Sequence, residues 1–257
     1  MEGRARRIRQ PRVAEIVASK LRDDILSGRL REGDILPTQQ SLFQEFGVSP
    51  PALREAIHLL ETDGLISVRR GNVGGAVVQM PSADRTAHMI GMVLQTRSAT
   101  PADVSEALLH LEPICAGMCA ARADRATEVV PYLQDEIDRQ AAQYDDMSQY
   151  VPNARRFHEA LVSRCGNEPM ILLIGSLELI WSTHESGVWT GEGEAGMSAS
   201  TMRAALRDHQ RLVDAIADGN TVRAGKLAAD HLTAARRTTL AAGDGKTIEA
   251  RLISHDR

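Results

Sequence analysis

A chain of 257 residues is long enough for one large domain or two ordinary ones, and its 43% of hydrophobic and 25% of charged residues are normal for a soluble globular protein. No apolar run approaches the roughly 20 residues that span a bilayer. No apolar stretch follows the basic N-terminus, as it would in a secretory signal. These features exclude a membrane-spanning or secreted class and predict a cytoplasmic protein.

Charge is divided unevenly along the chain, which carries a net charge of −4. Residues 1–80 hold 12 Lys and Arg against 10 Asp and Glu, whereas residues 81–257 hold 18 against 24. Within the first 12 residues a single acid, Glu2, faces five arginines, namely Arg4, Arg6, Arg7, Arg9 and Arg12. A basic flexible arm over residues 1–10 on an acidic body is typical of a protein that presents one end to a polyanion.

The first predicted helix starts after Pro11, because apolar residues recur at helical spacing up to Ile25 and Gly28 follows as a stop. A second, short helix is predicted between Thr38, which is a typical N-cap residue, and Gly47, which is a typical helix terminator.

Ser49 is predicted to cap a third helix that ends near Gly64. The two prolines behind Ser49 are tolerated, since the first N–H groups of a helix have no intrahelical acceptor. Strands over 65–69 and 76–79 then form a hairpin. A short turn between two helices lets the second enter a DNA major groove, and the hairpin is the wing. Residues 11–80 are therefore predicted to form a winged helix-turn-helix.

Beyond residue 80 the pattern is helical throughout. After a linker at 81–84, an all-helical domain is expected over 85–241, followed by a polar tail over 242–257. The predicted helices are 85–96, 101–123, 126–143, 147–165, 168–186, 197–218 and 221–241. A loop that includes Gly191, Gly193 and Gly196 is expected over 187–200. The fold class is thus mainly α, with a winged helix-turn-helix followed by an all-α helical bundle.

The segment LREGDILPTQQSLFQEFGVSPPALREAIHLLETDGLISVRRGNVGG resembles the winged helix of the GntR family of transcription regulators. The resemblance is carried by Gly33-Asp34, Leu36-Pro37, Gly47-Val48-Ser49, Leu53-Arg54-Glu55-Ala56, Leu60-Glu61, Gly64-Leu65-Ile66 and Arg70-Gly71. The second domain is similar to the FCD ligand-binding domain of the FadR subfamily. The matching pieces are Leu111-Glu112-Pro113, Phe157-His158, Cys165-Gly166-Asn167-Glu168-Pro169, Asp208-His209, Ala215-Ile216, Asp218-Gly219 and His231-Leu232.

In the GntR family, DNA contacts come from the first helix of the motif, the start of the second and the wing. The resemblance therefore implies contacts from Gln40, Ser49, Arg54, Arg69, Arg70 and Gly71. Arg54 is the expected reader of a base or a phosphate, because a guanidinium can make two hydrogen bonds to guanine.

Two features depart from the family pattern. Gln40 stands where relatives often carry arginine, and Pro50 and Pro51 stand where they carry polar or basic residues. Proline offers neither an N–H group nor a polar side chain. We therefore expect either fewer direct base contacts or an operator unlike the usual one. We also expect more reliance on the arginine-rich arm, and DNA binding that falls steeply with salt.

His158, His209 and His231 have apolar neighbours at helical spacing and are expected to point inward. In many relatives these positions bind a divalent metal together with an Asp or Asn one turn before the first histidine. The resemblance thus implies one Zn²⁺ or Ni²⁺ per chain, with open positions that accept a carboxylate. The alternative is that the histidines only line a pocket or are hydrogen-bonded core residues.

The expected effector pocket contains Leu108, Glu112, Ala154, His158, His209 and His231. Ala154 stands at the position of the fourth ligand, and Leu108 at that of a common arginine one turn before Glu112. Both changes remove polarity, which weakens the metal site and the grip on a small organic acid. They favour a larger, more apolar effector such as a fatty acyl molecule, with a carboxylate as the alternative.

The three cysteines, Cys115, Cys119 and Cys165, match neither a disulfide framework nor a zinc-finger spacing. They are expected to be buried thiols that pack as small hydrophobic groups.

These patterns predict a homodimeric transcription regulator that binds a palindromic operator and acts as a repressor released by a small molecule. The alternative from another class is an enzyme that uses the three-histidine metal site. Glu112 and Glu159 are its candidate bases, but no nucleophile motif or phosphate-binding loop accompanies them. A further alternative, an architectural DNA binder without an effector, leaves the large helical domain unexplained.

Overall fold

The computed structural model of the chain describes residues 12–68, 75–143, 147–190, 198–242 and 247–248. The chain divides into two compact units, which we call the winged unit (residues 1–82) and the helical unit (residues 83–257). Each unit has a hydrophobic core of its own. Among the described residues, no helix is both long and apolar enough to cross a membrane.

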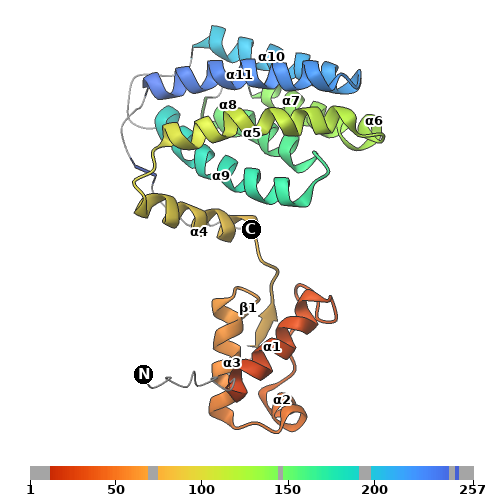
Figure 1. Cartoon of the computed structure of the whole chain (residues 1–257), viewed down its shortest axis with the longest axis vertical. Coiled ribbons are helices and arrows are strands. Elements are labelled where there is room, and N and C mark those ends of the chain that lie inside the picture. Colours follow the sequence, from red (N-terminus) through yellow and green to blue (C-terminus); the bar gives the residue numbers. More distant parts are fainter. Residues whose placement is uncertain (1–11, 69–74, 144–146, 191–197, 243–246, 249–257) are drawn as a thin grey trace, which may run out of the picture. The chain divides into compact units, whose positions relative to one another are not determined.

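The described part of the winged unit consists of three helices and a short hairpin (Figure 1). Its elements are α1 (Val13–Leu26), α2 (Gln39–Phe46), α3 (Pro50–Thr62), β1 (Ile66–Val68) and β2 (Ala76–Val78). The two strands are antiparallel, with Ile66 opposite Val78. Ile35 adds an isolated antiparallel bridge to Val77. The predicted helix-turn-helix and wing are therefore confirmed.

The core of the winged unit comes from the apolar residues that recur at helical spacing. The buried side chains of α1 and α3 face each other across the unit, and α2 adds Leu42. These core residues are Ala14, Val17, Ala18, Leu21, Ile25, Leu36, Leu42, Val48, Leu53, Ala56, Leu60, Leu65, Ile66 and Val78. Such a core holds α3 by its inner face and leaves its outer face free for contacts.

The turn between α2 and α3 follows the expected chemistry with one exception. Gly47 ends α2 in the left-handed conformation (φ 59°), which glycine adopts without strain. The Thr38 hydroxyl accepts the Ser41 N–H at 3.2 Å, as an N-cap does. Ser49 occupies the N-cap position of α3, but its side chain makes no capping bond. The prediction that Ser49 caps α3 is thus right in position and wrong in hydrogen bonding. Pro51 removes one of the two N–H groups from which an N-cap side chain usually accepts.

The helical unit is a stack of packed helices (Figure 1). Their bounds are α4 (Ala83–Thr96), α5 (Pro101–Ala121), α6 (Arg125–Glu128), α7 (Val130–Ala142), α8 (Met147–Ser163), α9 (Glu168–Thr190), α10 (Ala199–Ala217) and α11 (Thr221–Ala242). α5 lies between α11 on one side and α9 on the other, and it also contacts α8 and α10. A central helix with neighbours on several sides can bring their side chains to one point.

α5 and α11 approach each other unusually closely because small residues face the partner backbone. A Cβ atom on Gly225 of α11 would lie 3.2 Å from the carbonyl oxygen of Pro113. A Cβ atom on Gly117 of α5 would lie 3.5 Å from the carbonyl oxygen of Thr221. We call this contact the α5–α11 seam. It fixes the register between Glu112, which precedes Pro113, and the histidine of α11.

Three boundaries differ from the sequence-based expectation. The predicted helix over 126–143 is broken into α6 and α7 at Val129. Pro131 has no N–H group to donate a hydrogen bond to the preceding turn, but it fits the first turn of a new helix. α4 begins inside the predicted linker 81–84, and α9 continues beyond residue 186 to Thr190, into the predicted loop.

The predicted polar tail also contains a packed residue. Ile248 is buried against the core of the helical unit. Its N–H donates to the carbonyl oxygen of Ala99 at 3.0 Å. An apolar side chain in a polar stretch gains by leaving water, so the predicted polar tail packs against the helical unit at this residue.

Candidate functional site

The DNA-reading candidates of the winged unit that the structure describes lie at its surface. Gln40, Ser49 and Arg54 are all exposed. Among the described residues, none forms a hydrogen bond or ion pair with the Arg54 side chain, although Arg54 lies only one turn into α3. An exposed guanidinium with no partner can bind a base edge or a phosphate without first breaking a bond.

The start of α3 carries few polar groups. Pro50 and Pro51 occupy its first turn and remove two N–H groups that a phosphate would otherwise bind. Pro50 also borders a surface groove with a volume of about 380 Å³, whose other lining residues are Gln39, Gln40, Phe43, Gln44 and Leu53. Amide side chains read adenine, and apolar groups contact the methyl group of thymine. Amide and apolar side chains therefore border this groove beside the start of α3.

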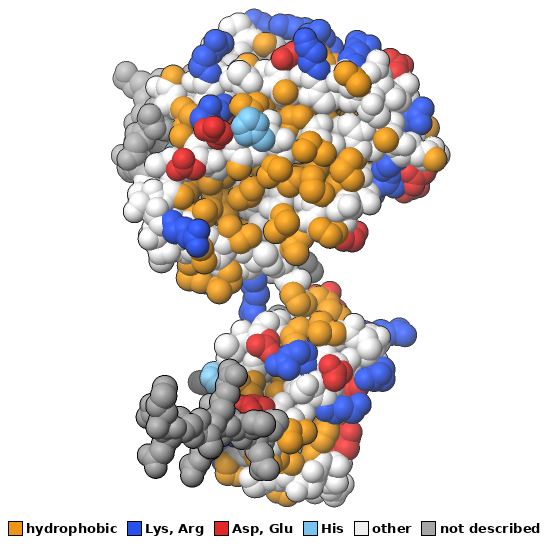
Figure 2. Space-filling model, viewed as in Figure 1, with side chains coloured by type: hydrophobic (Ala, Val, Ile, Leu, Met, Phe, Trp, Pro, Cys, Tyr) orange, Lys and Arg blue, Asp and Glu red, His pale blue; other side chains and the backbone are white. Residues whose placement is uncertain are grey.

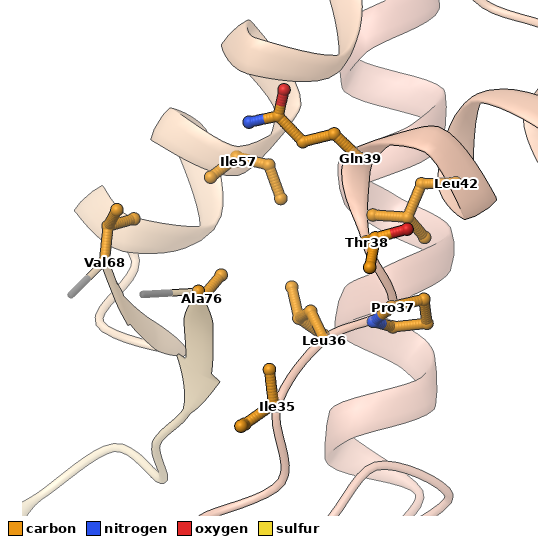
Figure 3. A pocket seen from close by; sticks show the side chains of 10 residues that line it. Ile35, Leu36, Pro37, Thr38, Gln39, Leu42, Ile57, Val68 and Ala76 are labelled. Atoms are coloured by element: carbon orange, nitrogen blue, oxygen red, sulfur yellow. The ribbon is translucent and has the colours of Figure 1, made fainter. Parts of the chain in front are cut away.

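A second groove lies between α2, α3 and the strands of the wing (Figure 3). It has a volume of about 370 Å³ and is mostly apolar. Ile35, Leu36, Pro37 and Ile57 supply much of its wall, and Val68 and Ala76 border it from the hairpin. It therefore lies where the wing packs against the helix-turn-helix.

The remaining DNA candidates lie outside the described residues. They are Arg69, Arg70 and Gly71 of the wing and the basic arm over residues 1–10. Arg12 is described, and it pairs with Glu55 of α3 at 3.4 Å. Both side chains of this pair are exposed, so its contribution to stability is small.

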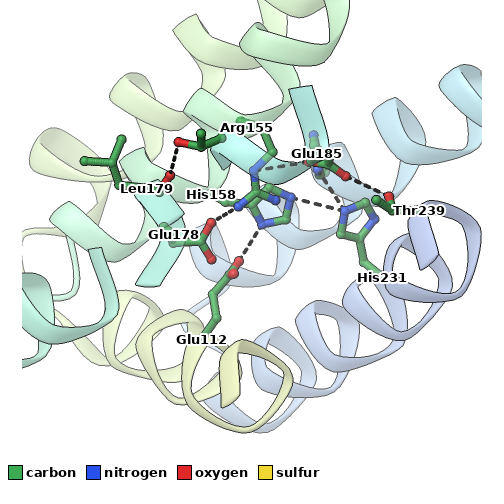
Figure 4. Close-up of polar contacts among 10 residues, drawn as sticks. Glu112, Arg155, His158, Glu178, Leu179, Glu185, His231 and Thr239 are labelled. Atoms are coloured by element: carbon green, nitrogen blue, oxygen red, sulfur yellow. Dashed lines mark hydrogen bonds and ion pairs between the residues drawn. The ribbon is translucent and has the colours of Figure 1, made fainter. Parts of the chain in front are cut away.

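Three histidines point inward, as their spacing predicted, and converge inside the helical unit, as the family resemblance implied. His158 of α8, His209 of α10 and His231 of α11 are all buried. The Nε2 atom of His231 lies 3.2 Å from Nε2 of His209 and 3.3 Å from Nε2 of His158 (Figure 4 shows the contact between His158 and His231). His209 also stacks on Phe157, with ring centroids 4.0 Å apart. Three helices thus direct one nitrogen each to a common point.

The opposite nitrogen of each ring faces an oxygen atom. Nδ1 of His158 lies 2.6 Å from Oε1 of Glu112, and Nδ1 of His209 lies 3.0 Å from Oε1 of Gln140. Nδ1 of His231 faces Oδ2 of Asp208 at 3.9 Å. An oxygen acceptor at Nδ1 favours the tautomer that carries its proton there. The three Nε2 lone pairs are then left pointing at one another.

Burial favours the neutral form of His158 and His209. Burial lowers the pKa of His158, although the neighbouring Glu112 carboxylate acts in the opposite direction. Burial, followed by the neighbouring histidines, lowers the pKa of His209 well below its usual value. For Glu112, burial opposes ionisation, but His158 still holds the pKa of this carboxyl below its usual value. The pair is therefore a carboxylate that accepts a hydrogen bond from a neutral imidazole.

The cluster fits a metal ion. Two nitrogens that are each about 2.0–2.1 Å from one ion lie about 3.0 Å apart in octahedral and about 3.4 Å apart in tetrahedral geometry. The two Nε2 separations, 3.2 and 3.3 Å, fall within this range. A divalent transition metal binds the neutral form of an imidazole. A hydrogen-bond acceptor at the other ring nitrogen then orients the ligand. The donor set and its spacing thus match a three-histidine site.

The residues near the predicted fourth ligand supply no further donor. Ala154 is half-buried and has no donor atom. The side chain of Asn153 hydrogen-bonds to Gln143 and is thereby occupied. Leu108 is buried and lines a cavity of only about 10 Å³, together with Ser105, Arg155, Trp181, Leu232, Ala235 and Arg236. Of Leu108, Ala154 and Glu112, Glu112 is the residue that contacts a histidine.

A buried ionic cluster was missed by sequence reasoning. Arg155 pairs with Glu178 and, at 3.3 Å, with Glu185, and Glu185 accepts a hydrogen bond from Thr239 at 3.0 Å (Figure 4). A signal for it does exist in the sequence. Glu178 interrupts the run from Met170 to Trp181, which is otherwise almost free of polar residues, and an acid in such a run needs a buried partner.

The cysteines are buried and free, as expected. Burial raises the pKa of Cys119 to about 12 and raises that of Cys115 further. The thiol of Cys119 donates to the carbonyl oxygen of Leu161 at 3.3 Å. These thiols are therefore structural groups rather than reactive ones.

Two known protein families match parts of this chain. Residues 13–77 match the family of bacterial regulatory proteins named gntR, and residues 103–234 match the FCD domain. The chain belongs to the GntR family. It is a GntR-family transcription regulator with an FCD domain, so it binds DNA and a small-molecule effector, and the enzyme alternative is set aside.

Relatives align along most of this GntR regulator. Mce2R, a transcriptional regulator of Mycobacterium tuberculosis, is 26% identical over 89% of this chain and 92% of its own. NanR, a transcriptional repressor of Klebsiella aerogenes, is 23% identical over 95% of this chain and 91% of its own. The solved structure of Streptococcus agalactiae GntR covers 88% of this chain and 99% of its own, with a TM-score of 0.69 at 22% identity. The likeness to that structure supports the fold.

Proposed function

We propose that the protein is a transcriptional repressor that binds a palindromic operator as a homodimer and is released by a small effector at a metal centre in the helical unit. The sensor role is supported by the geometry of the three histidines. Their Nε2 atoms converge, and the Nδ1 atom of each ring faces an oxygen acceptor. The relative from Klebsiella aerogenes is named as a repressor, which supports that direction of control.

His158, His209 and His231 would hold one Zn²⁺ or Ni²⁺ ion, and their Nδ1 partners would fix the rings. When bound, the ion supplies open coordination positions to which an effector oxygen can bind, because the histidines fill only three positions and Ala154 fills none. Leu108 and Glu112 flank this centre on α5.

A small polar effector fits the surroundings better than the fatty acyl molecule that Leu108 and Ala154 suggest. The cavity beside Leu108 has a volume of about 10 Å³, enough for roughly one water molecule. Arg155 and Arg236 line it alongside the apolar residues. An acyl chain would have to open a much larger space beside buried charges. Thermal stabilisation by acyl compounds, with none by small polar acids, would reverse this preference.

For the homodimer, α4 offers an apolar surface. Met89, Met92 and Val93 are spaced along one side of α4 and are all exposed. α9, which packs against α4, exposes Leu172 and Leu173. Figure 2 shows hydrophobic side chains gathered on one face of the helical unit. We propose that a second copy covers this surface, as the two half-sites of a palindrome require.

Sedimentation velocity tests the dimer. The double variant Met89→Glu and Val93→Glu should shift the protein to the mass of a monomer. The matched control is Val222→Glu, which places the same charge on an exposed valine at the start of α11. A dimer that survives the double variant would move the interface elsewhere.

The regulatory proposal is tested by measuring DNA binding with and without the metal. Native mass spectrometry first counts the ions per chain. DNA fragments selected from a random pool by the purified protein then serve as the operator in fluorescence anisotropy. An effector found by thermal shift should weaken binding about 5–150-fold, the usual range of allosteric coupling. Strengthened binding would identify a corepressor instead, and unchanged binding would remove the sensor role.

A further inference from the structure

Acids outnumber bases at the centre of the helical unit. Glu112, Glu178 and Glu185 are all buried, and Arg155 is the buried base that faces them among the described residues. Asp208 adds a fourth carboxylate at the edge, but it is one-third exposed and also pairs with Arg211 at 3.6 Å. Three buried carboxylates and one guanidinium leave two negative charges without a partner in a region of low dielectric.

The hydrogen bonding of this cluster is incomplete as well. Neither carboxylate oxygen of Glu178 has a hydrogen-bond partner, and Oε2 of Glu112 also lacks one. Arg155 approaches Glu178 and Glu185 as an ion pair, but its Nε and one terminal nitrogen make no hydrogen bond of proper geometry. Fully buried polar atoms without partners are rare, and each needs a partner such as a bound water, ion or ligand. The unpartnered atoms at this centre include acceptors on Glu112 and Glu178 and donors on Arg155 and Gln140, so a group that completes them carries both a donor and an acceptor.

A divalent ion on the three histidines would cancel the two excess charges and leave the centre neutral. An effector with two carboxylates would then add charge that nothing buried offsets. Arg236 does not change this balance, because it already pairs with Glu106 at 3.5 Å and donates to Ser105 at 3.0 Å. The charge count therefore disfavours a dianion and favours an effector without net charge.

We infer that the effector is an aminocarboxylate, whose carboxylate binds the metal and whose ammonium group donates hydrogen bonds to Glu178 and Glu185. This inference rests on the metal centre of the proposed function and names the class of its ligand. An ammonium group is a donor with three N–H bonds and one positive charge, which matches two acceptors that share a single arginine. Arg155, which pairs with both acids, also borders the small cavity beside Leu108 and Trp181.

Isothermal titration calorimetry on the zinc-loaded full chain tests this with four ligands of the same chain length: butyrate, succinate, 4-aminobutyrate and 2-aminobutyrate. At least one aminobutyrate should bind on the order of tenfold more tightly than butyrate, the usual effect of one charge-assisted hydrogen bond. Succinate should bind no more tightly than butyrate. A preference for succinate, or no binding by any of the four, overturns the inference.

Substitutions test whether Glu178 and Glu185 cause the tighter binding of aminobutyrates. Glu178→Gln keeps the shape of the side chain but removes its charge, and it should reduce the preference for the ammonium group by about tenfold. Glu136→Gln is the matched control, because Glu136 is also buried but pairs with Arg139 and Arg156. Glu185→Gln replaces Glu178→Gln if that variant fails to fold, as judged by its melting temperature. An unchanged preference in the glutamine variant overturns the role of the acids.

Native mass spectrometry separates the two levels of this proposal. A chain that takes up no zinc refutes the metal centre and the effector class together. A chain that takes up one zinc ion but prefers succinate leaves the metal centre standing and refutes only the aminocarboxylate.

Discussion

The two ends of this regulator place their functional groups in opposite surroundings. In the winged unit, Gln40, Ser49 and Arg54 face solvent, and the core beneath them is purely apolar. In the helical unit, the functional groups are themselves the centre of the core, where His158, His209 and His231 are buried with their partners. A DNA duplex is too large to be enclosed, so its reader must lie on a surface. A small effector can be enclosed, so its reader can use neighbours that would be worth little in water.

This contrast predicts that single substitutions have their largest effect in the buried site. His209→Ala removes one of three proposed ligands and should lower metal affinity by more than about 100-fold, because removing even an outer partner of a ligand costs 10–100-fold. A chelator-competition titration measures this. His58→Ala, which changes an exposed histidine of the winged unit, is the control. Equal zinc affinity in His209→Ala and the unaltered protein would rule out this site.

On the exposed side, Arg54→Ala should weaken binding to the selected operator by about 1–3 kcal/mol, the worth of one two-bond contact to guanine. Its melting temperature should not change, since Arg54 has no partner among the described residues. Fluorescence anisotropy with matched and mutated half-sites measures the loss. Arg29→Ala, which removes an exposed arginine paired with Asp24 beyond the end of α1, is the control. A loss shared by both variants would point to general charge rather than to reading by α3.

The arginine-rich arm sharpens the same comparison, because its contribution is purely ionic. Deleting residues 1–10 removes four arginines and should reduce the slope of log K against log salt by up to about four. Anisotropy at several salt concentrations measures the slope. An unchanged slope after deletion would place the phosphate contacts on the wing instead.

The smallest expected effect concerns the thiols of the helical unit. Because burial raises the pKa of Cys119 to about 12, only about one thiol in 10⁴ is ionised at pH 8. All three cysteines are also buried, so iodoacetamide should leave them unmodified in the native protein and label them after unfolding, as measured by intact mass. Labelling of a native thiol within minutes would mean that the core of the helical unit opens on that timescale.

The sequence predicted the direction of the functional side chains better than it predicted their partners. Helical spacing placed the three histidines inward, and the resemblance to the FCD domain implied that they share one site. The identity of their partners did not follow, because Gln140 and Asp208 become neighbours of a histidine only through the packing of α7, α10 and α11. The break at Val129 was missed because a proline is compatible with the first turn of a helix as well as with its end. The buried ion pairs of Arg155 were missed because charged residues are usually exposed.

The α5–α11 seam has a consequence for local motion. Where two helix backbones touch with no side chain between them, neither can loosen without the other, so their amide groups should open only when the whole unit unfolds. In hydrogen–deuterium exchange the central amides of α5 and α11 should therefore be the slowest of the chain. Their rates would then report the global free energy of unfolding of the helical unit, while the amides of α4 would exchange through smaller, local openings.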